Sequence, residues 1–196
     1  MRYPDLRHRL LRAAEQEIMA NGLARTSLRG IARRVGVSHQ ATAHHFDDRA
    51  GLFTALAVEG FTTLVERTRE AIAQTPEPGG HQVSAAAVAY LEFARRHPTT
   101  FDVMFRPELL HVDDAALVAV RTEHLELLLA TMGAARGTGW GPDLPVEQLH
   151  ALGWATVHGL AVLQRDGQLT DVHPDVDPAS VLLQVSLALE GLGRGG

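Results

Sequence analysis

Four small or polar side chains share one face of a short predicted helix that follows Ser38. A period of 3.6 residues directs these four outward: His39, Gln40, Ala43 and His44. A Gln side chain can pair with an adenine edge, a His can donate to guanine or to phosphate, and an Ala can contact the methyl group of thymine. The face therefore has the chemistry of a recognition helix in the major groove of DNA.

Two short helices joined by a tight turn would position that face. Thr26 and Ser27 can accept the free N–H groups at the start of a helix that ends before Gly36. Only Gly36 and Val37 separate it from Ser38, which can cap the next helix. Two short helices joined by a glycine-containing turn are typical of a helix-turn-helix unit. Arg29, exposed on the first of them, can reach a guanine edge or a phosphate.

The charge distribution supports this interpretation, although the net charge of the chain is -5. Residues 1–49 carry nine Arg against five acidic residues, whereas residues 50–196 carry nine Arg against 18. Attraction to phosphate acts locally, because charges beyond about 10 Å are screened at physiological salt. A basic N-terminal part on an acidic body is thus compatible with DNA binding.

The segment 26-TSLRGIARRVGVSHQATAHHFDDRAGLFTAL-56 resembles the helix-turn-helix of tetracycline-repressor-type (TetR family) regulators. The resemblance implies an N-terminal DNA-binding domain followed by a larger domain for ligand binding and dimerisation. Arg49 stands where the family usually has Lys, and Ala43 stands where it usually has a Tyr that holds the DNA backbone. The resemblance then implies that phosphate binding depends more on Ser27, His44, His45 and Arg49. The full set of residues predicted to bind DNA is Ser27, Arg29, His39, Gln40, Ala43, His44, His45 and Arg49.

Helical periodicity runs along the chain, and no period-2 run is flanked by hairpin turn signals. We therefore expect an all-α fold of about nine helices. Residues 76–80 (PEPGG) cannot continue a helix and are the clearest break. The predicted domains are residues 1–49, which bind DNA, and residues 50–196, which bind a ligand and dimerise.

A second resemblance concerns the segment 151-ALGWATVHGLAVLQRDGQL-169. It resembles the Trp-x-x-x-His-Gly motif in the C-terminal domain of one TetR subgroup, through Trp154, His158 and Gly159. The helix is apolar nearly all round, so a partner subunit is expected to cover one side of it. Small residues at four-residue intervals and an apolar stripe on the last helix give the predicted dimer interface: Ala151, Ala155, Gly159, Leu182, Val185 and Leu189.

Aromatic and apolar residues on the middle helices predict a pocket for a small hydrophobic effector. The same residue types at helical spacing are common in an ordinary core, and His158 fits a hydrogen-bonded core position equally well. The predicted lining is Tyr90, Phe93, Phe101, Met104, Phe105, His124, Leu128, Met132, Trp154 and His158.

Several function classes lack support in the sequence. The chain has no Cys, which excludes disulfides and thiolate chemistry and favours the cytoplasm. The sequence has no His-x-x-x-His pair with a nearby acid on a predicted helix, so it gives no sign of a metal site. It also has no phosphate-binding glycine loop and no Gly-x-Ser-x-Gly motif, so it gives no sign of an enzyme. No apolar run is long enough for a membrane span. We expect neither cofactor nor catalysis.

The sequence therefore predicts a homodimeric, ligand-responsive repressor that binds a palindromic operator. An alternative of another class stays open, because Ala43 replaces the expected Tyr: a helical ligand-binding or interaction module whose DNA binding has degenerated. A footprint on the DNA upstream of its own coding region distinguishes the two.

Overall fold

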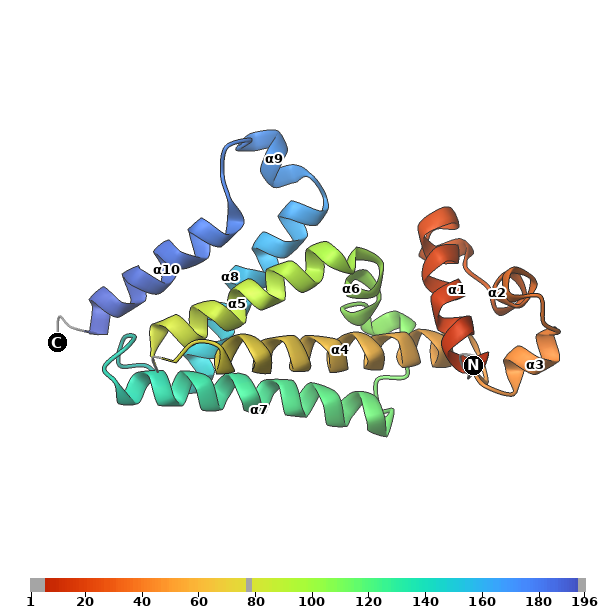
Figure 1. Ribbon diagram of the computed structural model, residues 1–196, viewed down its shortest axis with the longest axis horizontal. Coiled ribbons are helices and arrows are strands. Elements are labelled where there is room, and N and C mark those ends of the chain that lie inside the picture. Colours follow the sequence, from red (N-terminus) through yellow and green to blue (C-terminus); the bar gives the residue numbers. More distant parts are fainter. Residues whose placement is uncertain (1–5, 77–78, 194–196) are drawn as a thin grey trace. The chain divides into compact units, whose positions relative to one another are not determined.

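The computed structural model describes residues 6–76 and 79–193, and this part of the chain contains helices and no strand (Figure 1). The N-terminal helices are α1 (Leu6–Asn21), the 3-10 helix η1 (Leu23–Arg25), α2 (Leu28–Val35), α3 (His39–Ala43) and α4 (Arg49–Ala73). They are followed by α5 (Gly80–Arg96), α6 (Pro98–Met104), the 3-10 helix η2 (Pro107–Leu109), α7 (Ala115–Gly137), α8 (Val146–Arg165), α9 (Gln168–Val172) and α10 (Pro178–Gly193). The prediction of an all-α fold is confirmed.

The described residues form ten α-helices, one more than the nine predicted. The additional helix is α9, a five-residue helix in the connection between residues 165 and 178. So short a helix spans little more than one turn, which is too few residues to display an apolar period. The predicted break at residues 76–80 lies in the connection between α4 and α5 except for Gly80, which is the first residue of α5, and residues 77 and 78 lie outside the described part.

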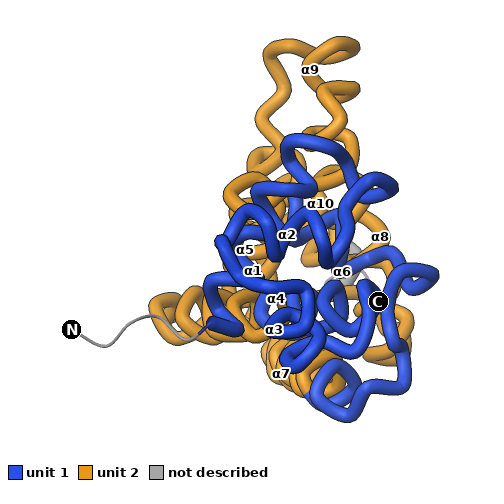
Figure 2. The backbone as a smooth tube through the Cα atoms, turned by 90° about the vertical axis from the view of Figure 1, so that its right-hand side faces the viewer, with its two compact units in different colours: residues 1–60, 99–119 blue, residues 61–98, 120–196 orange. Residues whose placement is uncertain are grey.

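The chain folds into two compact units (Figure 2). Unit 1 comprises residues 1–60 and 99–119, and unit 2 comprises residues 61–98 and 120–196. The helices α4 and α7 each begin in unit 1 and continue into unit 2. The predicted boundary after residue 49 divides a DNA-binding domain from a ligand-binding and dimerisation domain, and this division stays a prediction.

Unit 1 is built around α1, which packs against α2, while α2 packs against α3. The buried stripe of α1 includes Leu10, Leu11 and Ile18, as its period of apolar residues requires. Further along the chain, α6 also joins this unit. The hydroxyl group of Thr100 donates to the Glu15 carboxylate at 2.6 Å, which links α6 to α1.

Unit 2 is a helical bundle in which α5 packs against both α8 and α10. An ion pair between Arg69 and Glu123, at 2.8 Å, joins α4 to α7. The side-chain amide of Gln82 donates to the carbonyl oxygen of Thr75 at 2.9 Å and so ties the start of α5 to the end of α4. Within the described ranges, no helix is long and apolar enough to cross a membrane.

Candidate DNA-binding interface and ligand pocket

The helix-turn-helix geometry follows from three local features of the sequence. The hydroxyl oxygen of Ser27 accepts from the Gly30 N–H at 3.1 Å and caps α2, and Ser38 caps α3 in the same way through Ala41. Between the helices, Gly36 adopts a φ of 75°, a left-handed conformation that glycine enters without steric cost. These caps and this turn fix the direction of α3 relative to α2.

The helix α3 presents its polar face to solvent. His39, Gln40, Ala43 and His44 are exposed, whereas Thr42 is fully buried. Directly after the helix, Phe46 is also buried, and the guanidinium group of Arg7 lies 5.6 Å from its ring centroid. The side chains needed to read base edges are thus free, while the opposite side anchors the helix.

The other predicted DNA-binding residues differ in how exposed their side chains are and in which contacts they already make. Arg29 is exposed on α2. The guanidinium group of Arg49 lies over the Phe53 ring, 5.4 Å from its centroid, and is 3.4 Å from the carbonyl oxygen of Ala24. His45 is half-buried beside the rings of its two neighbours. DNA contacts from these residues stay predictions.

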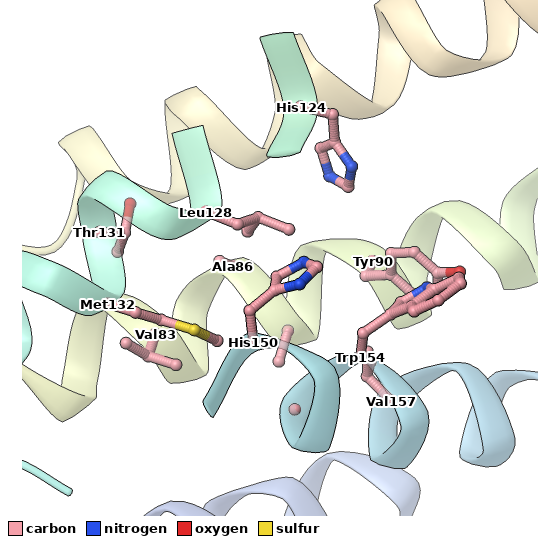
Figure 3. A pocket seen from close by; sticks show the side chains of 12 residues that line it. Val83, Ala86, Tyr90, His124, Leu128, Thr131, Met132, His150, Trp154 and Val157 are labelled. Carbon is pink, nitrogen blue, oxygen red and sulfur yellow. The ribbon is translucent and has the colours of Figure 1, made fainter. Parts of the chain in front are cut away.

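Unit 2 contains a small apolar cavity of about 70 Å³ between α5, α7 and α8 (Figure 3). Five of the residues predicted for a pocket line it: Tyr90, His124, Leu128, Met132 and Trp154. The remaining lining residues are Val83, Ala86, Ala87, Thr131, His150, Gly153 and Val157. None of the lining residues is an Asp, Glu or Arg.

A hydrogen-bonded chain occupies the aromatic end of this cavity. The hydroxyl group of Tyr90 lies 2.8 Å from Nδ1 of His158, and the indole of Trp154 also hydrogen-bonds the phenol. Burial raises the pKa of Tyr90 well above its usual range, so the phenol stays protonated and can donate to His158. Burial, and then the charge of Arg165, lowers the pKa of His158. Neutral His158 is therefore a hydrogen-bond partner of the lining residue Tyr90 and does not itself line the cavity.

Two histidines on facing helices contribute to the lining of this apolar cavity. Figure 3 shows the imidazole rings of His124, on α7, and His150, on α8, directed toward the cavity. Burial, together with the charge of His150, lowers the pKa of His124 to about 4, and burial also lowers the pKa of His150. The ring of His150 stacks on that of Trp154 at a centroid distance of 6.5 Å. Both histidines are neutral at pH 7.

The other residues predicted for the pocket lie elsewhere. Phe101, Met104 and Phe105 belong to unit 1, where the first two are buried in the core. Phe93 lies on α5 beside His97, with ring centroids 5.0 Å apart, and lines a separate open groove between α4 and α5. Phe93, Phe101 and Met104 are buried away from this cavity. Helical spacing alone does not distinguish an ordinary core position from a pocket position.

His150 lines the cavity but is not among the residues predicted from the sequence. Its spacing gave a signal, because His150, Trp154 and His158 follow one another at intervals of four residues and so share one face of α8. The Trp-x-x-x-His-Gly motif begins at Trp154 and so does not include His150.

The predicted dimer interface is only partly available at the surface. On α8, Ala151 and Ala155 are exposed and Gly159 is half-buried. On α10, however, Leu182 is buried inside unit 2, and Val185 and Leu189 are half-buried. Among the described side chains of α10, the large exposed apolar ones are instead Leu183 and Leu187, with 46% and 48% of their surface accessible. Leu182 thus packs inside unit 2, because an a/d spacing suits the chain's own bundle as well as a partner helix, and the dimer interface stays a prediction.

Comparisons with known proteins place both parts of the chain in one family. The sequence model of the family described as bacterial regulatory proteins, tetR family, matches residues 10–56. The model described as tetracyclin repressor-like, C-terminal domain, matches residues 83–186. Neither match distinguishes the Trp-x-x-x-His-Gly subgroup, which stays a prediction. No curated protein sequence matches the chain.

Solved structures share the fold over nearly the whole chain. A protein of unknown function from Rhodococcus sp. RHA1 is 27% identical, with a TM-score of 0.84 and coverage of 98% of each chain. A regulatory protein of the tetR family from Rhodococcus RHA1 is 17% identical, with a TM-score of 0.66 and 97% of each chain covered. The fatty acid degradation regulator FadR from Bacillus halodurans is 14% identical, with a TM-score of 0.73 and 99% of each chain covered.

The helix-turn-helix at the N-terminus and the match over more than half of the chain lead to the same conclusion. The chain belongs to the TetR family of bacterial transcriptional regulators, whose members bind DNA and act as dimers under the control of small molecules.

Proposed function

We propose that the chain is a cytoplasmic homodimeric repressor that binds a palindromic operator and leaves it when an apolar effector occupies the cavity of unit 2. The observation that carries this proposal is the exposed face of α3, with Gln40 and His44 free to contact base edges. Arg29 on α2 and Arg49 at the start of α4 would bind DNA phosphates.

Dimerisation is supported by apolar surface on α8 and α10. Leu152, Leu183 and Leu187 each expose more than two fifths of their surface. Adjacent small residues, Ala151 and Ala155, would let a partner helix approach closely. A two-fold dimer would present two α3 helices to half-sites about 34 to 36 Å apart, one helical turn of DNA.

The helix α4 offers a route from effector to operator. It starts directly after the helix-turn-helix and continues into unit 2. An effector that prefers one arrangement of unit 2 would shift the population of α4 positions, and so the spacing of the two recognition helices. The coupling can be no larger than the effector's difference in affinity between the two arrangements.

The test measures binding to the duplex upstream of the chain's own coding region, by fluorescence anisotropy over a range of salt concentrations. Arg29→Ala is expected to weaken binding to all sequences and to reduce the salt slope by about 1. Arg67→Ala is the matched control, because Arg67 is also exposed but lies on the unit 2 part of α4 and pairs with Glu70 at 3.0 Å. Footprinting would show whether the protected region is palindromic.

Two results would refute the proposal. One is binding to the upstream duplex no tighter than to unrelated duplex at low salt. The other is an equal loss of affinity in both Arg variants, since that would show a diffuse charge effect and no interface at α2 and α3.

A further inference from the structure

The polar groups of the unit 2 cavity fall into two sets. The first set is satisfied within the protein: Trp154 hydrogen-bonds the phenol of Tyr90, which lies 2.8 Å from Nδ1 of His158. The hydroxyl group of Thr131 likewise donates to the carbonyl oxygen of Leu127 at 2.8 Å. A ligand gains little from these groups, because their best partners are already in place.

The second set is His124 and His150. Among the residues that the structure describes, neither imidazole has a hydrogen-bond partner, and both rings are directed into the cavity (Figure 3). Each neutral imidazole carries one N–H donor and one nitrogen acceptor. A ligand that buries these rings without bonding them would leave polar atoms unpaired, at a cost of about 1 to 3 kcal/mol for each group.

We propose that the effector of this cavity is an uncharged apolar molecule with one hydroxyl group, held between His124 and His150. This inference rests on the proposed function, in which the cavity is the effector site. A hydroxyl group donates and accepts at the same atom, so it can accept from the N–H of one ring and donate to the bare nitrogen of the other. The remainder of the ligand would lie against Ala86, Leu128 and Val157.

A charged effector fits this cavity poorly. The lining contains no Asp, Glu or Arg to balance an ammonium or a carboxylate, and a buried unpaired charge is strongly unfavourable. Protonating a histidine to balance an anion is also costly, because burial lowers the pKa of both rings. The small volume, about 70 Å³, limits the apolar part of the ligand to a single ring at most, and the lining side chains must move apart to admit it.

Four probes with the same ring test the class of ligand: benzyl alcohol, toluene, benzoate and benzylamine. Dissociation constants are measured by ligand-observed NMR at pH 7, and operator affinity is measured in parallel. We expect benzyl alcohol to bind at least about tenfold more tightly than toluene, which corresponds to the net contribution of one or two neutral hydrogen bonds. Benzoate and benzylamine are expected to bind more weakly than either.

Two variants assign the preference to the histidines. His124→Phe and His150→Phe keep a ring of similar size and remove the polar atoms, so each is expected to retain toluene binding and to lose most of the preference for benzyl alcohol. His81→Phe is the matched control, because His81 is exposed on α5 and does not line the cavity. Its preference is expected to equal that of the parent chain.

The proposal is overturned if toluene binds as tightly as benzyl alcohol, if benzoate or benzylamine binds more tightly, or if no probe binds. It is also overturned if the preference survives in both histidine variants. The proposed function fails separately: benzyl alcohol would then show the expected selectivity, while saturating concentrations leave operator affinity unchanged.

Discussion

The carboxylate of Glu17, on α1, accepts hydrogen bonds from Nε and Nη2 of Arg34, on α2, at 3.1 and 2.8 Å. Glu17 is 93% buried in α1, and its second oxygen accepts from the side-chain amide of Asn21 at 3.0 Å. This acid thus joins the first helix to the helix-turn-helix through bonds to a charged partner, which are stronger than neutral ones.

Replacing Glu17 should destabilise the N-terminal helices. In Glu17→Ala the guanidinium group of Arg34 and the amide of Asn21 lose their partner, and we expect a loss of about 1 to 3 kcal/mol in the free energy of unfolding. Urea denaturation followed by circular dichroism measures this. Glu66→Ala, at an exposed position of α4, is the control and should change stability by less than about 0.5 kcal/mol. Equal effects of the two substitutions would show that the Glu17 contacts contribute nothing.

Gly30 lies directly against the same carboxylate. A Cβ atom at this position would be 2.8 Å from Oε1 of Glu17, so Gly30→Ala must displace the acid. Without that acid, Ala should stabilise α2 by about 0.5 to 1 kcal/mol, because it favours helix more than Gly does. We expect Gly30→Ala to destabilise the parent chain and to stabilise Glu17→Ala. The same sign of effect in both backgrounds would contradict this coupling.

The sequence predicts the recognition unit well because its signals are local. Caps at Ser27 and Ser38 and the turn at Gly36 act within a few residues, and a 3.6-residue period suffices to direct Gln40 outward. The structure agrees with each of these expectations. Base contacts depend on DNA, and they stay predictions.

The pocket and the dimer face could be predicted only in part, because they depend on which helices meet. Phe101 and Leu128 are both apolar residues of predicted helices, but α6 packs into unit 1 and α7 supplies the cavity wall in unit 2. Similarly, Leu182 and Leu183 are neighbours on α10, and only the packing of α10 on α5 decides which of them is buried. Periodicity gives the faces of a helix and not their partners.

Asp48 caps α4 and should make stability depend on pH. Its Oδ1 accepts from the Gly51 N–H at 2.7 Å and lies 2.9 Å from Nε2 of His111, and these interactions, the Gly51 bond first, lower the pKa of Asp48. A carboxyl group with a depressed folded-state pKa stabilises the fold above its unfolded value of 3.8 and loses this contribution as pH falls through the folded value.

We therefore expect Asp48→Ala to lower the free energy of unfolding by about 0.5 to 2 kcal/mol at pH 7, the usual range for a lost helix cap. The difference from the parent chain should shrink toward zero in the acid range below pH 3.8. Urea denaturation at a series of pH values measures both quantities. Asp47→Ala is the control at the adjacent exposed carboxylate. A difference that persists undiminished in acid would show that packing, and not the ionised cap, accounts for the effect.

The exposed face of α10 should decide the oligomeric state. Leu187→Glu places a charge in the proposed interface, where burying it without a partner is unfavourable, so we expect the dimer to dissociate to monomers that keep their helical content. Light scattering coupled to size exclusion gives the mass. Val172→Glu on α9 is the control, because Val172 is 70% exposed and lies outside the proposed face. Dissociation in the control alone would place the interface at α9.

Ala43 offers a gain-of-function test of the DNA interface. It is exposed at the end of α3, at the position where the resemblance predicts a Tyr that holds the DNA backbone. In Ala43→Tyr the phenol can donate to a phosphate oxygen, and a hydrogen bond to a charged acceptor contributes about 1.5 to 3 kcal/mol. We expect operator affinity to rise by about tenfold or more.

The gain should be nearly the same on operator and unrelated duplex, because phosphate contacts carry no base information. The salt slope should stay unchanged, since a neutral phenol releases no counterion. Anisotropy titrations on both duplexes at several salt concentrations separate these effects. Ala130→Tyr, at an exposed position of α7 in unit 2, is the control and should leave affinity unchanged. An unchanged affinity in Ala43→Tyr would mean that α3 meets the DNA in an orientation that keeps residue 43 away from the backbone.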